Sequence, residues 1–159
     1  MSMIFAAIQA QSGDHSAIAR LVANWNWTHR GRTSTLSATG LVWAAGRVVQ
    51  FVWQQMGCAG SVNLTSLPTV MTVLDFSFNQ FSGPLDLTRL PTGMTYLGLS
   101  YNQFRGPLPN LSSLPAGMIQ LTLEDNDFCG STGIDIPCVN VALDNNCTCG
   151  GSAVQWPAC

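Results

Sequence analysis

The sequence predicts an α+β repeat solenoid, in which short strands from successive repeats form one parallel sheet on the concave face. Three observations predict this fold class. A segment recurs along the chain every 23 or 24 residues, each copy contains a short alternation of apolar residues, and charged residues make up only 9% of the 159 residues. We expect a helical cap before the repeats and a cysteine-rich cap after them.

Three full copies of the segment begin at Leu67, Leu90 and Leu114. Their equivalent residues fall in six columns: Met71, Met94 and Met118; Leu74, Leu97 and Leu121; Phe76, Leu99 and Leu123; Asn79, Asn102 and Asn126; Phe81, Phe104 and Phe128; Gly83, Gly106 and Gly130. This spacing and composition are those of leucine-rich repeats. We therefore expect repeats over 48–150: full ones at 67–89, 90–113 and 114–137, and degenerate ones at 48–66 and 138–150.

The pattern within one repeat explains why the copies stack. Leu97 and Leu99 alternate with Gly98 and Ser100, so the leucines point inward from a short strand. After the strand the chain turns sharply, and asparagine can donate and accept the hydrogen bonds that the turn leaves open. We expect a structural asparagine ladder, which consists of Asn79, Asn102, Asn126 and Asn146. The phenylalanine column behind it removes apolar surface from water.

The N-terminal segment, residues 1–47, precedes the repeats, and residues 151–159 form a short tail. Ile18, Leu21, Val22 and Trp25 recur at helical spacing, which predicts a helix at about 15–27. We expect this helix to cover the open hydrophobic end of the solenoid. The alternative is a helix that binds a membrane surface or a partner, although its polar face has no basic bias.

Composition excludes several classes of protein. Six arginines against eight acidic residues give a net charge of −2, which argues against a nucleic-acid binder. No apolar run is long enough to span a bilayer. His15 and His29 both precede the repeats, and no nucleophile motif appears, so we expect neither an enzyme nor a cofactor. Residues 124–127 could hold a cation, but Asn126 belongs to the ladder, so we expect no metal.

Five of the six cysteines lie in the last 31 residues, which favours a disulfide-stapled cap in an oxidising compartment. The alternative is a set of reduced, buried thiols in a cytosolic protein. Cys129 and Cys149 share a column in adjacent repeats, and this makes them the favoured disulfide pair. Six cysteines still allow 15 connectivities.

The outward-facing strand positions are where ligands normally bind in this type of fold. The candidate ligand-binding residues are Gln55, Asp75, Phe78, Tyr101, Glu124 and Asp125. Phe78 beside Tyr101 makes an aromatic pair with carboxylates around it, which suits recognition of a protein or a glycan. Alternatively, the two rings only pack on each other across adjacent strands.

Four sequons for N-glycosylation occur, at Asn26, Asn63, Asn110 and Asn146. Asn63 and Asn110 occupy the same repeat column, on the return segment that should face outward, and these two with Asn26 are the candidate sites. Asn146 falls in the ladder column, where a buried side chain could not be modified.

The run LxxLxLxxNxFxGxLP resembles the plant-type subclass of extracellular leucine-rich repeats, and NQFSGPL and NQFRGPLP match its diagnostic segment. Repeats that open with LPTGM and LPAGM, after GRVVQFVWQQMGCAGSVNLTSLP, resemble the leucine-rich-repeat surface antigens of kinetoplastid protozoa over roughly residues 40–150. Trp43 stands where that family has a cap cysteine, and no hydrophobic tail follows Cys159.

The resemblance implies a non-catalytic protein, extracellular or on the cell surface, that recognises proteins or glycans through its strand face. A weak apolar stretch at residues 3–10 leaves open whether a signal peptide is present or the true start is missing. The alternative function is a structural surface coat antigen, or a truncated family member, without a defined ligand.

Overall fold

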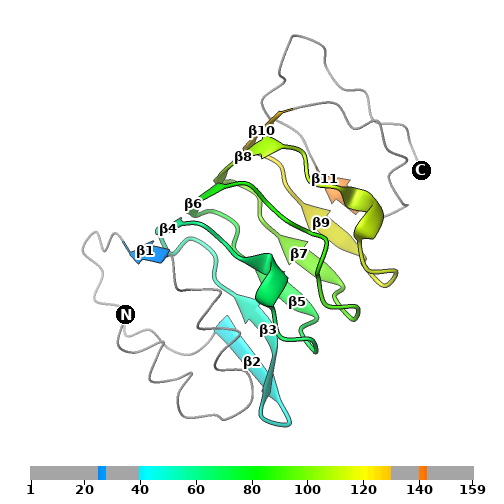
Figure 1. Ribbon diagram of the computed structural model, residues 1–159. Coiled ribbons are helices and arrows are strands. Elements are labelled where there is room, and N and C mark those ends of the chain that lie inside the picture. Colours follow the sequence, from blue (N-terminus) through cyan, green and yellow to red (C-terminus); the bar gives the residue numbers. More distant parts are fainter. Residues whose placement is uncertain (1–24, 28–39, 130–139, 143–159) are drawn as a thin grey trace.

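The structure, a computed structural model, describes residues 25–27, 40–129 and 140–142. In these residues the chain winds through successive turns of a solenoid, and each full turn contributes one strand to each of two sheets (Figure 1). The leucine-rich-repeat stack predicted from the sequence is confirmed. The predicted architecture had only one sheet, however, and the second sheet is a correction to it.

The six-stranded sheet has the order β11-β9-β7-β5-β3-β2. Its strands are β2 (Leu41–Ala44), β3 (Arg47–Val52), β5 (Val73–Asp75), β7 (Tyr96–Gly98), β9 (Gln120–Thr122) and β11 (Asn140–Ala142). All neighbours are parallel except β2, which pairs antiparallel with β3. The tight turn between them uses Ala45 and Gly46 at φ 49° and 74°, which suits a two-residue hairpin.

The second sheet has the order β1-β4-β6-β8-β10 and lies further along each turn. Its strands are β1 (Trp25–Trp27), β4 (Cys58–Gly60), β6 (Gln80–Gly83), β8 (Gln103–Pro107) and β10 (Asp127–Cys129). The glycines Gly60, Gly83 and Gly106 have φ between 97° and 118°, where a Cβ would be strained. They let β4, β6 and β8 bend into the return segments.

The strand register confirms the repeat alignment. Leu74 lies opposite Leu97, and Leu97 lies opposite Leu121, so the predicted column becomes a physical row. Both degenerate repeats join the same row: Phe51 pairs with Leu74, and Val141 pairs with Leu121.

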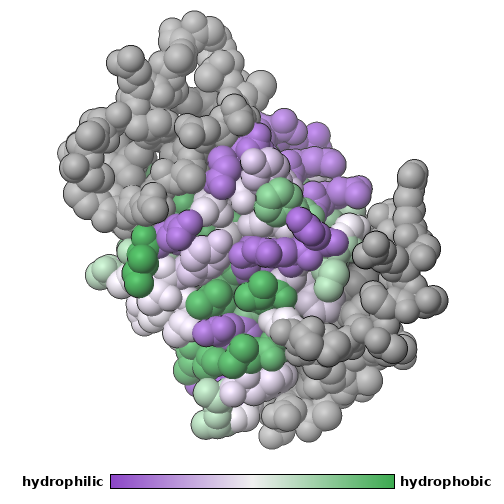
Figure 2. All heavy atoms as spheres, turned by 180° about the vertical axis from the view of Figure 1, so that it is seen from behind, coloured by the Kyte–Doolittle hydropathy of each residue, from purple (hydrophilic) through white to green (hydrophobic). Residues whose placement is uncertain are grey.

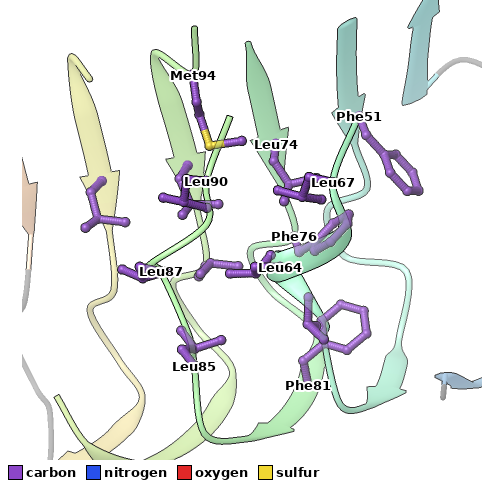
Figure 3. Packing of buried hydrophobic residues seen from close by; sticks show 14 of the residues in the cluster. Phe51, Leu64, Leu67, Leu74, Phe76, Phe81, Leu85, Leu87, Leu90 and Met94 are labelled. Carbon is purple, nitrogen blue, oxygen red and sulfur yellow. The ribbon is translucent and has the colours of Figure 1, made fainter. Parts of the chain in front are cut away.

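The core lies between the six-stranded sheet and the return segments (Figure 3). Phe81, Phe104 and Phe128 stack behind the turns, with neighbouring ring centroids 6.4 Å apart. Cys58 occupies the equivalent position at the first turn and is fully buried. A smaller side chain therefore ends the phenylalanine stack where the solenoid begins.

The predicted N-terminal helix is wrong at its C-terminal end. Residues 25–27 form β1, which pairs antiparallel with β4 along the edge of the second sheet. The open edge of that sheet offers backbone hydrogen bonds, and tryptophan is a favourable strand residue. The rest of the predicted helix lies outside the described residues, as do the tail and most of the cysteine-rich cap.

Two short 3-10 helices, η2 (Leu64–Ser66) and η3 (Leu111–Ser113), lie on the return segments, across the core from the six-stranded sheet (Figure 1). Leu64 and Leu111 are buried and attach these segments to the core. Within the described part of the chain, no helix has the length and apolar character needed to cross a membrane.

Candidate binding surface on the six-stranded sheet

The outward-facing side of the six-stranded sheet, hereafter the strand face, carries every predicted ligand-binding residue. It consists of Val52, Gln54, Gln55, Asp75, Ser77, Phe78, Tyr96, Ser100, Tyr101, Gln120, Thr122, Glu124 and Asp125. Figure 2 views the molecule from the side opposite η2 and η3 and shows hydrophobic and hydrophilic residues interspersed on it. The face is therefore mixed in character rather than a continuous apolar patch.

One column of this face has an unusual backbone. Gln55, Phe78, Tyr101 and Asp125 all have positive φ, between 53° and 59°. A residue with a Cβ loses roughly 1–2 kcal/mol in this left-handed conformation. Each of these residues lies at the end of the strand face, just before the ladder position of its turn. That position is Met56 in the first turn and an asparagine in the other three. The chain keeps large aromatic side chains at two of these strained positions.

Phe78 and Tyr101 stack on each other, with ring centroids 4.3 Å apart and planes 8° apart. The packing interpretation is thus geometrically correct. Packing does not bury the pair, because Phe78 and Tyr101 are 45% and 46% exposed. The two rings form an exposed aromatic ridge on the strand face.

Asp75, one of the predicted ligand-binding residues, is not an exposed carboxylate. Its side chain is only 5% exposed. Its Oδ1 accepts a 3.0 Å hydrogen bond from the Ser77 amide, and its Oδ2 accepts from Gln54 Nε2 and, at 3.3 Å, from the Tyr96 hydroxyl. Asp75 therefore organises the strand face rather than offering a free carboxylate.

Gly98 explains how this carboxylate is accommodated. A Cβ at Gly98 would lie 2.6 Å from Asp75 Oδ1 and 3.0 Å from the Tyr96 ring. Both side chains use the space that the glycine leaves empty. Tyr96 was not predicted as a site residue. It precedes the Leu97-Gly98-Leu99 segment, and the predicted outward positions began only at Gly98.

The C-terminal part of the face is acidic. Glu124 Oε2 is buried and has no hydrogen-bond partner among the residues that the structure describes. Asp125 accepts a hydrogen bond from the Tyr101 hydroxyl. The hydrogen bond and charge of Asp125 raise the pKa of Tyr101. Burial, followed by the charge of Asp75, raises the pKa of Tyr96. Glu124 raises both pKa values further, so its negative potential reaches both hydroxyl groups.

Three of the four predicted ladder asparagines, Asn79, Asn102 and Asn126, form hydrogen bonds to the preceding turn. Asn79 Oδ1 accepts from the amides of Met56 and Cys58 on the preceding turn, each at 3.1 Å. Asn102 and Asn126 accept in the same way from Phe81 and Phe104, both at 3.0 Å. Each Nδ2 donates to three backbone carbonyls. Asn146 lies outside the described residues.

The other predicted sites are placed in part. Asn63 and Asn110 are exposed on the return segments, as predicted, and Asn26 lies in the middle of β1. Cys129 ends β10, and its predicted partner Cys149 lies outside the described residues. Among the described residues, no group of three or more His, Cys, Asp or Glu side chains is arranged to hold a metal ion.

Comparison with known proteins identifies the fold. The BIR2 ectodomain from Arabidopsis thaliana superposes with a TM-score of 0.60 at 22% identity, over 75% of this chain and 70% of that one. The leucine-rich-repeat ectodomain of the receptor kinase SOBIR1 from Arabidopsis thaliana gives 0.50 at 17% identity, over 86% and 95%. PEPR1, solved with AtPEP1, gives 0.55 at 18% identity, over 85% of this chain and 25% of PEPR1.

No protein-family model matches the sequence, and no curated protein matches it. The chain is thus similar to plant leucine-rich-repeat ectodomains in fold, at a low level of sequence identity. The plant-type repeat predicted from NQFSGPL and NQFRGPLP has the corresponding three-dimensional form.

Proposed function

We propose that this protein is a non-catalytic recognition module, extracellular or on the cell surface, that binds a protein ligand through its strand face. The exposed Phe78–Tyr101 ridge is the observation that carries the proposal. Aromatic side chains are common anchors at protein interfaces, and here they stand on rigid, hydrogen-bonded strands. The resemblance of the repeats to kinetoplastid surface antigens supports the location.

The charge of the face favours a ligand with basic side chains next to the aromatic contact. Asp75, Glu124 and Asp125 are acidic, and the strand-face columns among the described residues contain no lysine, arginine or histidine. Complementary charge raises association rates and selects partners. A glycan ligand remains the alternative, because carboxylates and tyrosine hydroxyls also suit sugar hydroxyls.

The small size of the surface limits the affinity. Strands about 4.8 Å apart give the described sheet a width of only about 25 Å. An interface of standard size buries about 800 Å² on each partner, which would require nearly the whole face. We therefore expect a weak single contact that is strengthened when several copies act together.

A binding screen against arrays of extracellular protein domains and of glycans, with the chain displayed multivalently, tests this proposal. Phe78→Ala and Tyr101→Ala should each weaken binding of a ligand so found by about tenfold or more. Gln103→Ala, an exposed change on β8, is the control and should leave binding unchanged. All variants must have the wild-type fold by circular dichroism.

Engineered glycans provide a second test of where the ligand binds. Gln120→Asn creates an Asn-Leu-Thr sequon on β9 of the strand face, and Asp86→Asn creates the same tripeptide on a return segment. A glycan at position 120 should block binding, and one at position 86 should not. Equal binding by both glycoforms would show that the ligand binds elsewhere. A chain that binds nothing on either array would favour a structural coat protein.

A further inference from the structure

Three successive turns place the same pattern of side-chain hydrogen bonds on the return segments. Asn63 begins the first, Asp86 the second and Asn110 the third, and each is followed by leucine and a hydroxyl residue. Asn63 Oδ1 accepts from the Thr65 amide at 3.1 Å and from its hydroxyl at 2.7 Å. Asn110 Oδ1 does the same with Ser112, at 2.9 and 2.8 Å.

Asp86 reproduces this pattern with a carboxylate. Its Oδ1 accepts from both the amide and the hydroxyl of Thr88. The hydrogen bond from the Thr88 hydroxyl, followed by the one from its amide, lowers the pKa of Asp86. The three turns therefore share the same hydrogen bonds to their first side chain, although Leu64–Ser66 and Leu111–Ser113 are 3-10 helices and residues 87–89 are not. The first side chains differ at one atom, because Asp86 has an oxygen where Asn63 and Asn110 have Nδ2.

The availability of Nδ2 separates these asparagines from those of the ladder. Asn63 and Asn110 are exposed, and within the described residues their Nδ2 atoms donate no hydrogen bond. In contrast, Asn79 is buried and its Nδ2 donates to the carbonyls of Trp53, Phe76 and Ser77. A group attached to a ladder asparagine would break the solenoid, whereas one attached at position 63 or 110 would enter solvent.

We infer that Asn63 and Asn110 are acceptors of N-linked glycans, aligned on one flank of the solenoid. The turn between them carries Asp86, which has no Nδ2 and accepts no glycan. The inference rests on the extracellular location in the proposed function. The glycosyl donor is a lipid-linked oligosaccharide diphosphate. Nδ2 forms a bond to the anomeric carbon, the bond from that carbon to the phosphate oxygen breaks, the lipid diphosphate leaves, and Nδ2 loses one proton.

The position of this flank gives the glycans a defined relation to the proposed binding surface. The return segments with η2 and η3 lie across the core from the six-stranded sheet (Figure 1). The two acceptors are two turns apart, or about 10 Å at the usual spacing of strands. Glycans there cover the return side and leave the strand face open to a ligand.

The experiment expresses the chain behind a heterologous signal sequence in mammalian cells and maps glycopeptides in both medium and lysate. We expect glycan at both Asn63 and Asn110. Thr65→Val should remove the first and Ser112→Ala the second. Asp86→Asn should add a third glycan, with secretion within about twofold of the wild-type level, because the equivalent turn already tolerates an exposed side chain there.

Because glycosylation takes place during translocation, the lysate reports on occupancy even for a variant that is not secreted. Absence of glycan at either asparagine would overturn the inference, and so would retention of the Asp86→Asn chain inside the cell. A glycosylated chain without any ligand would overturn the proposed function alone. A chain that carries no glycans but binds a ligand through Phe78 and Tyr101 would overturn this inference and leave the proposed function intact.

Discussion

At the scale of single residues, Gly98 determines the structure of the strand face. It is the only residue type that leaves room for the Asp75 carboxylate, which is already held by three hydrogen bonds and cannot move aside at low cost. The position of the Asp75 carboxylate thus depends on the lack of a side chain at Gly98.

We predict that Gly98→Ala destabilises the protein by about 1–3 kcal/mol, because the new methyl group would overlap Asp75. Urea unfolding followed by circular dichroism measures the change. Gly93→Ala is the matched control, since a Cβ at Gly93 meets no atom within 4 Å, and we expect it to change the free energy by less than about 0.5 kcal/mol. Equal effects of the two changes would show that the clash is absent.

Cys58 is the one cysteine whose side chain the structure describes, and burial raises its pKa from 9.0 to about 11. We predict that the native thiol does not react with iodoacetamide at pH 8, where the denatured chain reacts, as peptide mass spectrometry of Cys58 would show. The folded state binds this proton more tightly. The contribution of the protonated Cys58 thiol to the stability of the fold is therefore complete below pH 9 and is lost as the pH rises towards 11. Rapid native alkylation would contradict the buried position.

At the scale of elements, the turns are joined by the asparagine ladder more specifically than by apolar contact. Asn102 accepts from the Phe81 amide and donates to the Phe76 carbonyl, both on the preceding turn, and also donates to Leu99 and Ser100 on its own. One side chain thus closes two adjacent turns.

Asn102→Ala should cost about 3 kcal/mol, because it leaves buried backbone groups without partners. The equilibrium free energy of unfolding in urea measures this loss. Asn110→Ala, on the exposed return segment, removes an asparagine that bonds only its own turn, and should cost about 1 kcal/mol. A ladder variant as stable as the Asn110 variant would mean that water replaces the lost side chain.

At the scale of the whole molecule, each turn contacts only its two neighbours, so local stability depends on position in the stack. We predict that amide hydrogen exchange is slowest in β7, which has full repeats on both sides, and faster in β2, which lies at the edge of its sheet. Exchange followed by mass spectrometry would test this gradient. Uniform protection across the sheet would indicate a single cooperative unit instead.

The stack itself was predictable from the sequence, because the physical rules that repeat in space also repeat along the chain. Leu97, Asn102 and Phe104 recur with fixed spacing, and each fell in its predicted column. The second sheet was missed because its strands pair through backbone atoms and leave no apolar alternation. The prediction of a helix was wrong at Trp25–Trp27 because these residues form backbone hydrogen bonds with the open edge of the second sheet. This pairing is more favourable than the helix that the local apolar spacing predicts.

The candidate surface was predictable only as a set of positions. Strand alternation identified Phe78 and Tyr101, but their stacked geometry depends on the left-handed backbone at both residues. The burial of Asp75 depends on Gly98 and Tyr96, which lie on the next strand, and a reading of one repeat at a time does not relate them.

The direction of the asparagine ladder also bears on how the protein is made. Every described ladder side chain reaches back, so the amides of one turn are satisfied only by an asparagine that is synthesised 21 to 23 residues later. A nascent chain that emerges N-terminus first therefore always has one unfinished turn at its growing end. Folding during synthesis must lag one repeat behind translation, and each new repeat completes its predecessor before it is complete itself.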